Sequence, residues 1–140
     1  MIRIEMNRVT GDYGFEAKDA NGHLLTTDTS PENGGLNAGV RPMQMLLMAL
    51  GGCSGIDVVM ILKKQRQELQ GLRMEISGER EAGKEPSLWK KVHVVFELQG
   101  NLDVTKAERA CELSMVKYCS VAETLRLAGA HITWEVRVTA

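Results

Sequence analysis

The sequence predicts an α+β domain in which two apolar helices pack on β-strands. Two observations lead to this prediction. Short segments at both ends and in the middle alternate apolar with polar residues, which is typical of strands with one wet face, and two longer segments repeat apolar residues at intervals of three and four. The chain of 140 residues suits one compact domain spanning 1–140. The predicted order is β-ββ-α-ββ-α-β.

The first part of the chain is predicted to form three strands. Residues 2–6 alternate apolar and charged side chains, so a strand is expected to begin near Ile2. Segments 14–20 and 23–28 flank Asn21-Gly22, the dipeptide that best tolerates the two positive φ angles of a type I′ turn. We therefore expect a β-hairpin with a two-residue turn at this point.

A turn-rich segment leads into the most apolar part of the chain. Residues 29–41 are rich in glycine, asparagine and proline and predict a loop. Pro42 suits the first turn of a helix, which we expect to run to about Gln70 and to stop at Gly71. Polar interruptions indicate a core helix and not a membrane span. Because more than one face is apolar, we expect it to be covered by a sheet and another helix, or by a second subunit.

Glycines in the middle of this helix require a compensating reason. Each costs about 1 kcal/mol relative to alanine in a helix interior. We expect another backbone to approach closely beside Cys53, next to Gly51, Gly52 and Gly55.

The second half of the chain repeats the pattern of strands followed by a helix. Segments 72–81 and 91–99 alternate and predict a strand pair, and residues 131–139 predict a closing strand. Thr105 and Glu108 have the spacing of a capping box, so one continuous helix is expected from there to Gly129. Its apolar stripe consists of Ala107, Cys111, Met115, Cys119 and Ala122.

Composition excludes several classes of function. A net charge of −1 lacks the basic surface that nucleic-acid binding requires, and three irregularly spaced cysteines are not a disulfide framework. No signal peptide is visible, and we expect a cytoplasmic protein. The three histidines fall in separate predicted strands and no cysteine pair has short spacing, so we expect no metal site. Gly34-Gly35 is interpreted as a turn, because phosphate-binding motifs are absent.

Cys53 and Cys119 are the candidates for chemistry, because each lies in the middle of a predicted helix. If the helices pack together, they form a buried pair of thiols, although buried cysteine also serves as a small apolar filler. A reactive thiolate needs a cation, hydrogen-bond donors or a helix N-terminus nearby. Asp57 and Glu123 lie one turn further on and would raise a thiol pKa if they faced it, whereas Arg126 lies near the face of Cys119.

Two runs carry a family resemblance. The sequence RPMQMLLMALGGCSGIDVV, followed far downstream by KYCSVAETL, resembles the OsmC/Ohr family of osmotically inducible and organic hydroperoxide resistance proteins, most closely its YhfA-like subgroup. The resemblance covers nearly the whole chain. It implies an intertwined homodimer whose two central helices per chain pack between sheets. It also implies a peroxidase cycle in which Cys53 attacks an organic hydroperoxide and Cys119 resolves the sulfenic acid as a disulfide.

The resemblance implies no bound cofactor, but an external low-molecular-weight or lipoyl thiol as reductant. The sequence departs from the family pattern at three places. The glutamate that follows the helix-opening proline is absent, since Met43 and Gln44 stand there, the N-terminal hairpin has Lys18 but no arginine, and Ser120 replaces a proline. A non-catalytic dimer that binds a small apolar or electrophilic ligand is therefore the alternative, and a purely structural homodimer is a third possibility.

Overall fold

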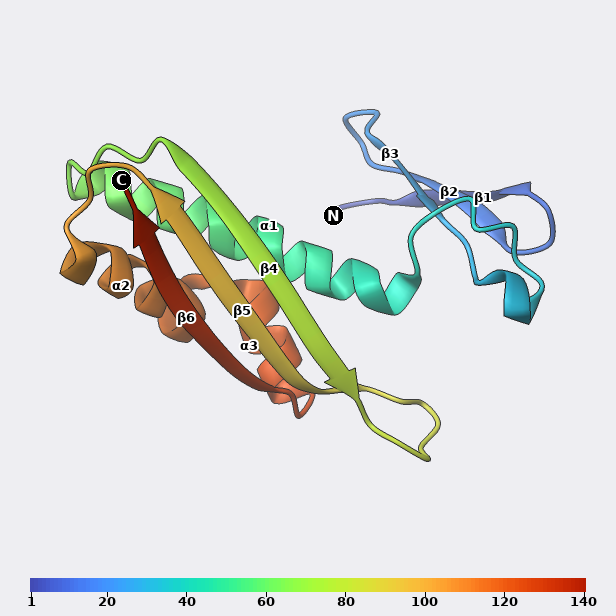
Figure 1. Cartoon of the computed structure of the whole chain (residues 1–140). Coiled ribbons are helices and arrows are strands. Elements are labelled where there is room, and N and C mark those ends of the chain that lie inside the picture. Colours follow the sequence, from blue (N-terminus) through green and yellow to red (C-terminus); the bar gives the residue numbers. More distant parts are fainter. The chain divides into compact units, whose positions relative to one another are not determined.

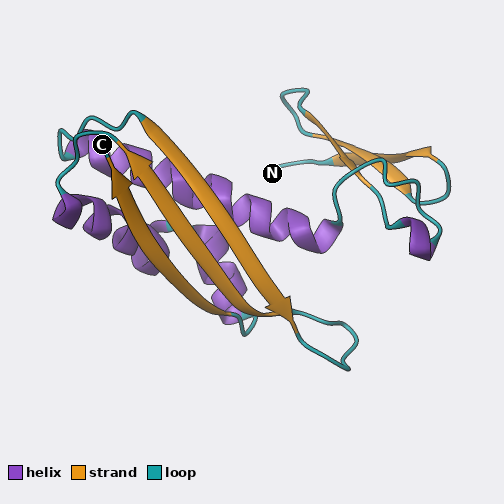
Figure 2. Cartoon of the chain, in the orientation of Figure 1, coloured by secondary structure: helices purple, strands orange, loops and turns teal.

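The computed structural model describes all residues from 1 to 140 and divides the chain into two compact units, Met1–Leu46 and Leu47–Ala140. Each unit contains one three-stranded sheet (Figure 2), and the helices follow the predicted order except that the last one is divided. The α+β class is thereby confirmed. That the whole chain acts as one domain stays a prediction.

The first unit contains the antiparallel sheet β1-β2-β3. Its strands are β1 (Glu5–Thr10), β2 (Gly14–Lys18) and β3 (Leu24–Thr27), and a short 3-10 turn, η1 (Pro31–Asn33), follows. β1 begins at Glu5 and not near Ile2, because Glu5 pairs with Lys18, the last residue of β2. The residues before Glu5 therefore find no strand opposite them.

The hairpin between β2 and β3 is confirmed, but its turn differs from the predicted one. Only Gly22 has a positive φ, at 85°, so the two-residue type I′ turn is wrong. The carboxylate of Asp19 accepts the backbone amides of Asn21 (3.0 Å) and His23 (2.8 Å), and the Asp19 carbonyl accepts the amide of Gly22. These bonds to Asp19 make a longer turn that includes His23, which we had placed in a strand.

The loop after β3 is organised by one buried carboxylate. Asp28 is 3% exposed and accepts the backbone amides of Thr29 (2.8 Å), Leu36 (3.0 Å) and Ala38 (3.1 Å). The amide of Ala38, together with the other two, holds the pKa of Asp28 below its usual value. The loop that precedes the first long helix thus has a fixed path.

Helix α1 (Pro42–Lys64) begins at Pro42 as predicted but ends well before Gln70. Arg66 takes the left-handed conformation with φ 57°, and the amides of Arg66 and Gln67 bond to the carbonyls of Lys63 (3.0 Å) and Leu62 (2.9 Å). This is a Schellman motif, here formed by arginine instead of glycine. Gly71, which we expected to stop the helix, opens strand β4 (Gly71–Arg80).

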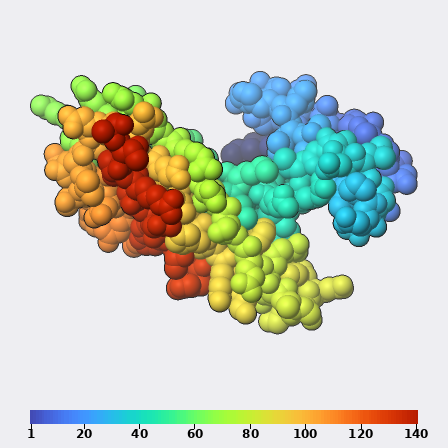
Figure 3. Space-filling view, in the orientation of Figure 1, coloured from blue at the N-terminus to red at the C-terminus, as the bar shows by residue number.

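The second unit is a sheet with helices on one face (Figure 1). Strand β5 (Trp89–Gln99) pairs antiparallel with β4 and parallel with β6 (His131–Thr139). Alternate residues of β5 are buried beneath the helices. No helix covers the opposite face of the sheet, which is open in the space-filling view (Figure 3). The buried set consists of Val92, Val94, Phe96 and Leu98.

The glycines of α1 have a different explanation from the predicted one. A Cβ on Gly51 would lie 2.8 Å from the side chain of Ile76, and one on Gly55 would lie 2.9 Å from that of Met74. Both contacts are with side chains of β4, not with another backbone. Gly52 has no neighbour within 4 Å, because it lies on the exposed face of the helix.

The predicted second helix is broken into three parts. These are α2 (Val104–Leu113), a π-helical turn η2 (Ser114–Tyr118) and α3 (Ser120–Leu127). The start at Thr105 is wrong, because Asp103 is the N-cap and its carboxylate accepts the amide of Lys106 at 3.0 Å. The end is confirmed: Gly129 has φ 109° just after the last turn.

Candidate active site

The break in the helix determines where Cys119 lies. The amide of Cys119 bonds to the carbonyl of Ser114 at 2.8 Å, five residues back, which closes a π turn. Cys119 then leaves the helical conformation, with φ −74° and ψ 105°, and becomes the N-cap of α3. Its sulfur accepts the amide of Ala122 at 3.3 Å. Cys119 therefore lies at the N-terminus of a helix. The sequence predicts it in the middle of one continuous helix, and that prediction is wrong.

Arg126 satisfies the backbone at this break. In a regular α-helix the amide of Cys119 would bond to the carbonyl of Met115, but the π turn directs that amide elsewhere. Arg126 donates to the Met115 carbonyl at 2.5 Å and forms an ion pair with Glu123 at 2.8 Å. The contacts of Arg126 thus support the local backbone, and Glu123 pairs with this arginine.

The two predicted thiols lie together, with Asp57 beside them. The ligand atoms of Cys53, Asp57 and Cys119 all lie within 4.8 Å of one another. Cys53 is half-buried and Cys119 is only 4% exposed. The third cysteine, Cys111, is fully buried and belongs to no such group. α1 and the start of α3 therefore form one site, as expected from packing of the two helices.

A serine that the sequence analysis did not single out positions the carboxylate. The hydroxyl of Ser114, which is completely buried, donates to Asp57 Oδ2 at 3.0 Å and lies 3.5 Å from the carbonyl of Ser54. Its own carbonyl accepts the amide of Cys119. Ser114 consequently connects Asp57 on α1 to the backbone that carries Cys119.

Burial governs the ionisation of two of the thiols. The pKa of Cys119 is raised to about 11, chiefly by burial and in smaller part by the neighbouring Cys53 thiol, while the amide of Ala122 opposes the rise. Burial likewise raises the pKa of Cys111 to about 12. Both thiols are therefore protonated at neutral pH. Cys53 is half-exposed whereas the other two cysteines are buried, so an oxidant from solution reaches Cys53 first.

Alkylation rates test these raised values. Between pH 7 and 9 the reaction of iodoacetamide with Cys119 should accelerate about tenfold per pH unit without levelling off, because the thiolate fraction grows tenfold per unit below the pKa. Peptide mass spectrometry of the quenched protein measures each cysteine separately. In urea, as a control, the rate should level off near the ordinary thiol pKa of about 8.5. A plateau below pH 9 in the folded protein would contradict the raised pKa.

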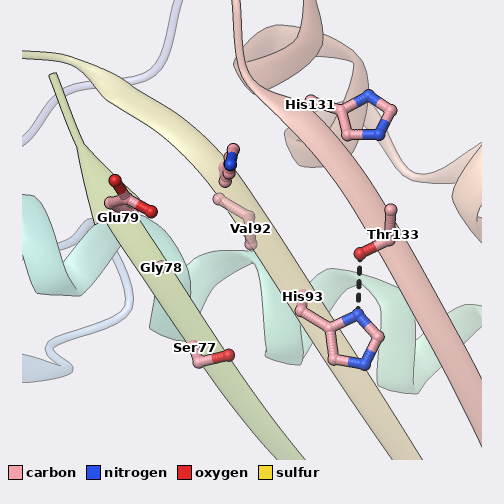
Figure 4. A pocket seen from close by; sticks show the side chains of 8 residues that line it. Ser77, Gly78, Glu79, Val92, His93, His131 and Thr133 are labelled. Atoms are coloured by element: carbon pink, nitrogen blue, oxygen red, sulfur yellow. Dashed lines mark hydrogen bonds between the residues drawn. The ribbon is translucent and has the colours of Figure 1, made fainter.

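A separate hollow lies on the sheet of β4, β5 and β6, on the face away from the helices (Figure 4). It measures about 470 Å³ and holds His93, whose Nδ1 lies 2.7 Å from Thr133 Oγ1 and whose Nε2 lies 3.3 Å from Glu135 Oε1. Its lining contains no cysteine. His131, at the start of β6, also lines it but lies apart from His93. We interpret this hollow as part of the solvated outer face.

The sequence contains a signal for the helix break at Cys119 but none for the role of Ser114. Ser120 and Glu123 have the serine-x-x-glutamate spacing that often opens a helix, one residue away from the observed start of α3. Ser114 carries no comparable signal, because its partners are Asp57 and the backbone of distant residues.

Comparison with known proteins places the chain in a family. The family model of OsmC-like proteins matches residues 34–135. Protein YhfA of Escherichia coli K12 is 39% identical over 127 residues, which cover 90% of each chain. A hypothetical protein from Aquifex aeolicus superposes with a TM-score of 0.81 at 30% identity, covering 100% of this chain and 98% of its own. An organic hydroperoxide resistance protein OsmC from Legionella pneumophila shares the fold, with a TM-score of 0.75 at 16% identity and coverage of 99% and 97%. Because the family model matches well over half of the chain and a relative with 39% identity covers 90% of it, the chain belongs to the OsmC-like family.

Proposed function

We propose that this protein reduces organic hydroperoxides with an external thiol as the electron donor. The observation that carries the proposal is the pair of sulfurs of Cys53 and Cys119, held within 4.8 Å by separate helices, one half-exposed and the other buried. This is the arrangement of an attacking and a resolving thiol. Membership of a family that includes proteins named for organic hydroperoxide resistance supports the same chemistry.

The reaction proceeds in two steps in this proposal. The Cys53 thiolate attacks the terminal oxygen of the hydroperoxide, so a sulfur–oxygen bond forms while the oxygen–oxygen bond breaks. The alkoxide leaves and takes up one proton, equivalent to the one that the Cys53 thiol lost on ionising, to give the alcohol. The Cys119 sulfur then attacks the sulfenic acid, a disulfide bond forms, and water leaves. The two thiols lose two electrons and the hydroperoxide gains them. A dithiol reductant, such as dihydrolipoamide, returns the disulfide to two thiols.

The distance between the sulfurs suits this sequence. A disulfide bond is about 2.05 Å long, so the two sulfurs, which lie within 4.8 Å, must approach each other as the bond forms. Cys119 is an N-cap with extended backbone angles after a π turn, and rotation of its side chain requires no break in a regular helix. Cys111, buried elsewhere in α2, takes no part.

We propose further that the protein works as a homodimer in the cytoplasm. Met48, Gly52, Ile56 and Met60 follow one another at intervals of four along α1 and form an exposed apolar face, here called the α1 outer face. α1 is also long and apolar enough to cross a membrane, a property that it shares with core helices of soluble proteins. A second copy of the chain would cover the α1 outer face, while the opposite face of the helix stays packed on β4. A reducing compartment suits the free thiols.

The proposal is tested by turnover and by mapping the oxidised product. Reduced protein should consume cumene hydroperoxide with dithiothreitol or dihydrolipoamide as reductant. Peptide mapping after one equivalent of hydroperoxide should give a Cys53–Cys119 disulfide with Cys111 free. A dominant bridge to Cys111 would mean that the site is wrongly assigned. If the hydroperoxide is not consumed and neither thiol is oxidised, the ligand-binding dimer becomes the better account.

A further inference from the structure

We propose that the reduced protein binds a zinc ion through Cys53, Asp57 and Cys119. Two thiolate sulfurs and one carboxylate oxygen form a ligand set that suits Zn²⁺, which accepts sulfur and oxygen donors in tetrahedral geometry. Three protein ligands leave the fourth position for water. The inference concerns the thiols before any oxidation and does not depend on the proposed peroxidase activity.

The three ligand atoms already lie close to the positions that an ion would require. They lie within 4.8 Å of one another, whereas two sulfurs bound to one Zn²⁺ at about 2.3 Å lie roughly 3.8 Å apart in a tetrahedron. Cys53 and Asp57 are four residues apart on α1 and so share a helical face, and Cys119 projects from the N-cap of α3. Small side-chain rotations are sufficient to close the site. Half-burial of Cys53 and Asp57 leaves a route from solvent.

The surroundings hold two of the ligands in place. The buried Ser114 hydroxyl donates to Asp57 Oδ2 at 3.0 Å, and the amide of Ala122 donates to the Cys119 sulfur at 3.3 Å. Such outer hydrogen bonds orient metal ligands and account for about 10- to 100-fold in affinity at known sites. Zn²⁺ binds cysteine in the thiolate form, so binding at this site displaces the thiol protons and becomes tighter as the pH rises.

The absence of a short-spaced cysteine motif does not conflict with this site. The sequence predicts no metal site, because no two cysteines are closely spaced and the histidines fall in separate predicted strands. The fold brings the ligands from α1 and α3, which are far apart along the chain. Zinc binding and the Cys53–Cys119 disulfide exclude each other, because sulfurs joined to one another no longer act as thiolate ligands. The bound ion therefore protects the dithiol, and its release accompanies oxidation.

The test is a metal titration of the reduced full-length protein. Cobalt(II) should bind with one equivalent per chain and produce thiolate charge-transfer absorption together with the intense visible bands of tetrahedral coordination. Zinc should abolish these bands by displacement. Cys53→Ser and Cys119→Ser should each lower zinc affinity at least about 100-fold, and Asp57→Ala and Ser114→Ala should lower it about 10-fold or more. Cys111→Ala is the matched control and should bind as the wild type does.

A second measurement needs no substitution. Diamide converts the dithiol to a disulfide by taking up two electrons and two protons, and it should release the ion from the folded wild-type protein, as followed with a chromogenic chelator. Absence of stoichiometric binding by the wild type would overturn the proposal. So would tetrahedral cobalt bands that persist in Cys53→Ser or Cys119→Ser, or that disappear in Cys111→Ala. Failure of peroxidase activity has no bearing on these readouts, so the two proposals stand or fall separately.

Discussion

Cys53→Ser is expected to lower kcat/KM for cumene hydroperoxide at least about 1,000-fold, because it removes the nucleophile that breaks the oxygen–oxygen bond. Serine is nearly isosteric with cysteine, so the packing of α1 on β4 should remain. Consumption of hydroperoxide with dithiothreitol as reductant measures the loss. Cys111→Ala serves as the control and should retain activity within about twofold, because Cys111 lies outside the site.

Cys119→Ser separates the two steps of the same reaction. This variant should react once with hydroperoxide and stop at a Cys53 sulfenic acid, because the resolving sulfur is missing. Dimedone should then add to Cys53, as seen by intact mass and peptide mapping. If dimedone instead labels Cys119 of the Cys53→Ser variant at a comparable rate, the roles of the two cysteines are reversed. If wild-type turnover survives Cys53→Ser, the peroxidase proposal fails.

Ile56→Lys is expected to separate the dimer into monomers. Met48, Ile56 and Met60 are 51%, 63% and 52% exposed in one chain, and covering the exposed half of each side chain contributes about 1 kcal/mol. A lysine at the centre of this α1 outer face loses that contribution and adds the cost of burying a charge, so the dissociation constant should rise by several orders of magnitude. Sedimentation of the wild type should give about 31 kDa, twice the 15.4 kDa chain.

The control for this variant places a lysine on a face that we expect to stay wet. Ser77→Lys, on the polar face of β4, should leave the dimer intact. A stable, folded wild-type monomer at micromolar concentration would contradict the proposed dimer. Recovery of the wild type only with detergent or membranes would indicate instead that α1 meets lipid.

Periodicity along the chain was sufficient to predict most of the secondary structure. Alternation of apolar and polar residues predicted the strand pair β4 and β5, and the spacing of apolar residues with Pro42 predicted the start of α1. These patterns are informative because a strand or helix buries one face against the core, so apolar residues recur with the period of that element. The α+β class, the order of elements and the two candidate thiols followed from such local signals and from the family resemblance.

The ends and breaks of elements depended on individual polar contacts that periodicity does not record. The left-handed Arg66 ends α1, the Asp103 carboxylate starts α2, and Asp19 determines the hairpin turn. In each case the boundary lies at a residue other than the one that local sequence signals favoured, which were Gly71 for the end of α1 and Thr105 for the start of α2. Differences of this kind amount to about 1 kcal/mol, which is enough to move a boundary by several residues.

The sequence by itself identified Cys53 and Cys119 and gave the reason to pair them. Only the tertiary structure showed that a π turn moves Cys119 to the N-cap of α3, that Asp57 faces both thiols, and that Ser114 joins the two segments. These relations involve atoms far apart along the chain, so no spacing rule contains them. They arise because packing of α1 against the divided helix determines which polar groups meet, and this packing depends on the volume and shape of the whole core.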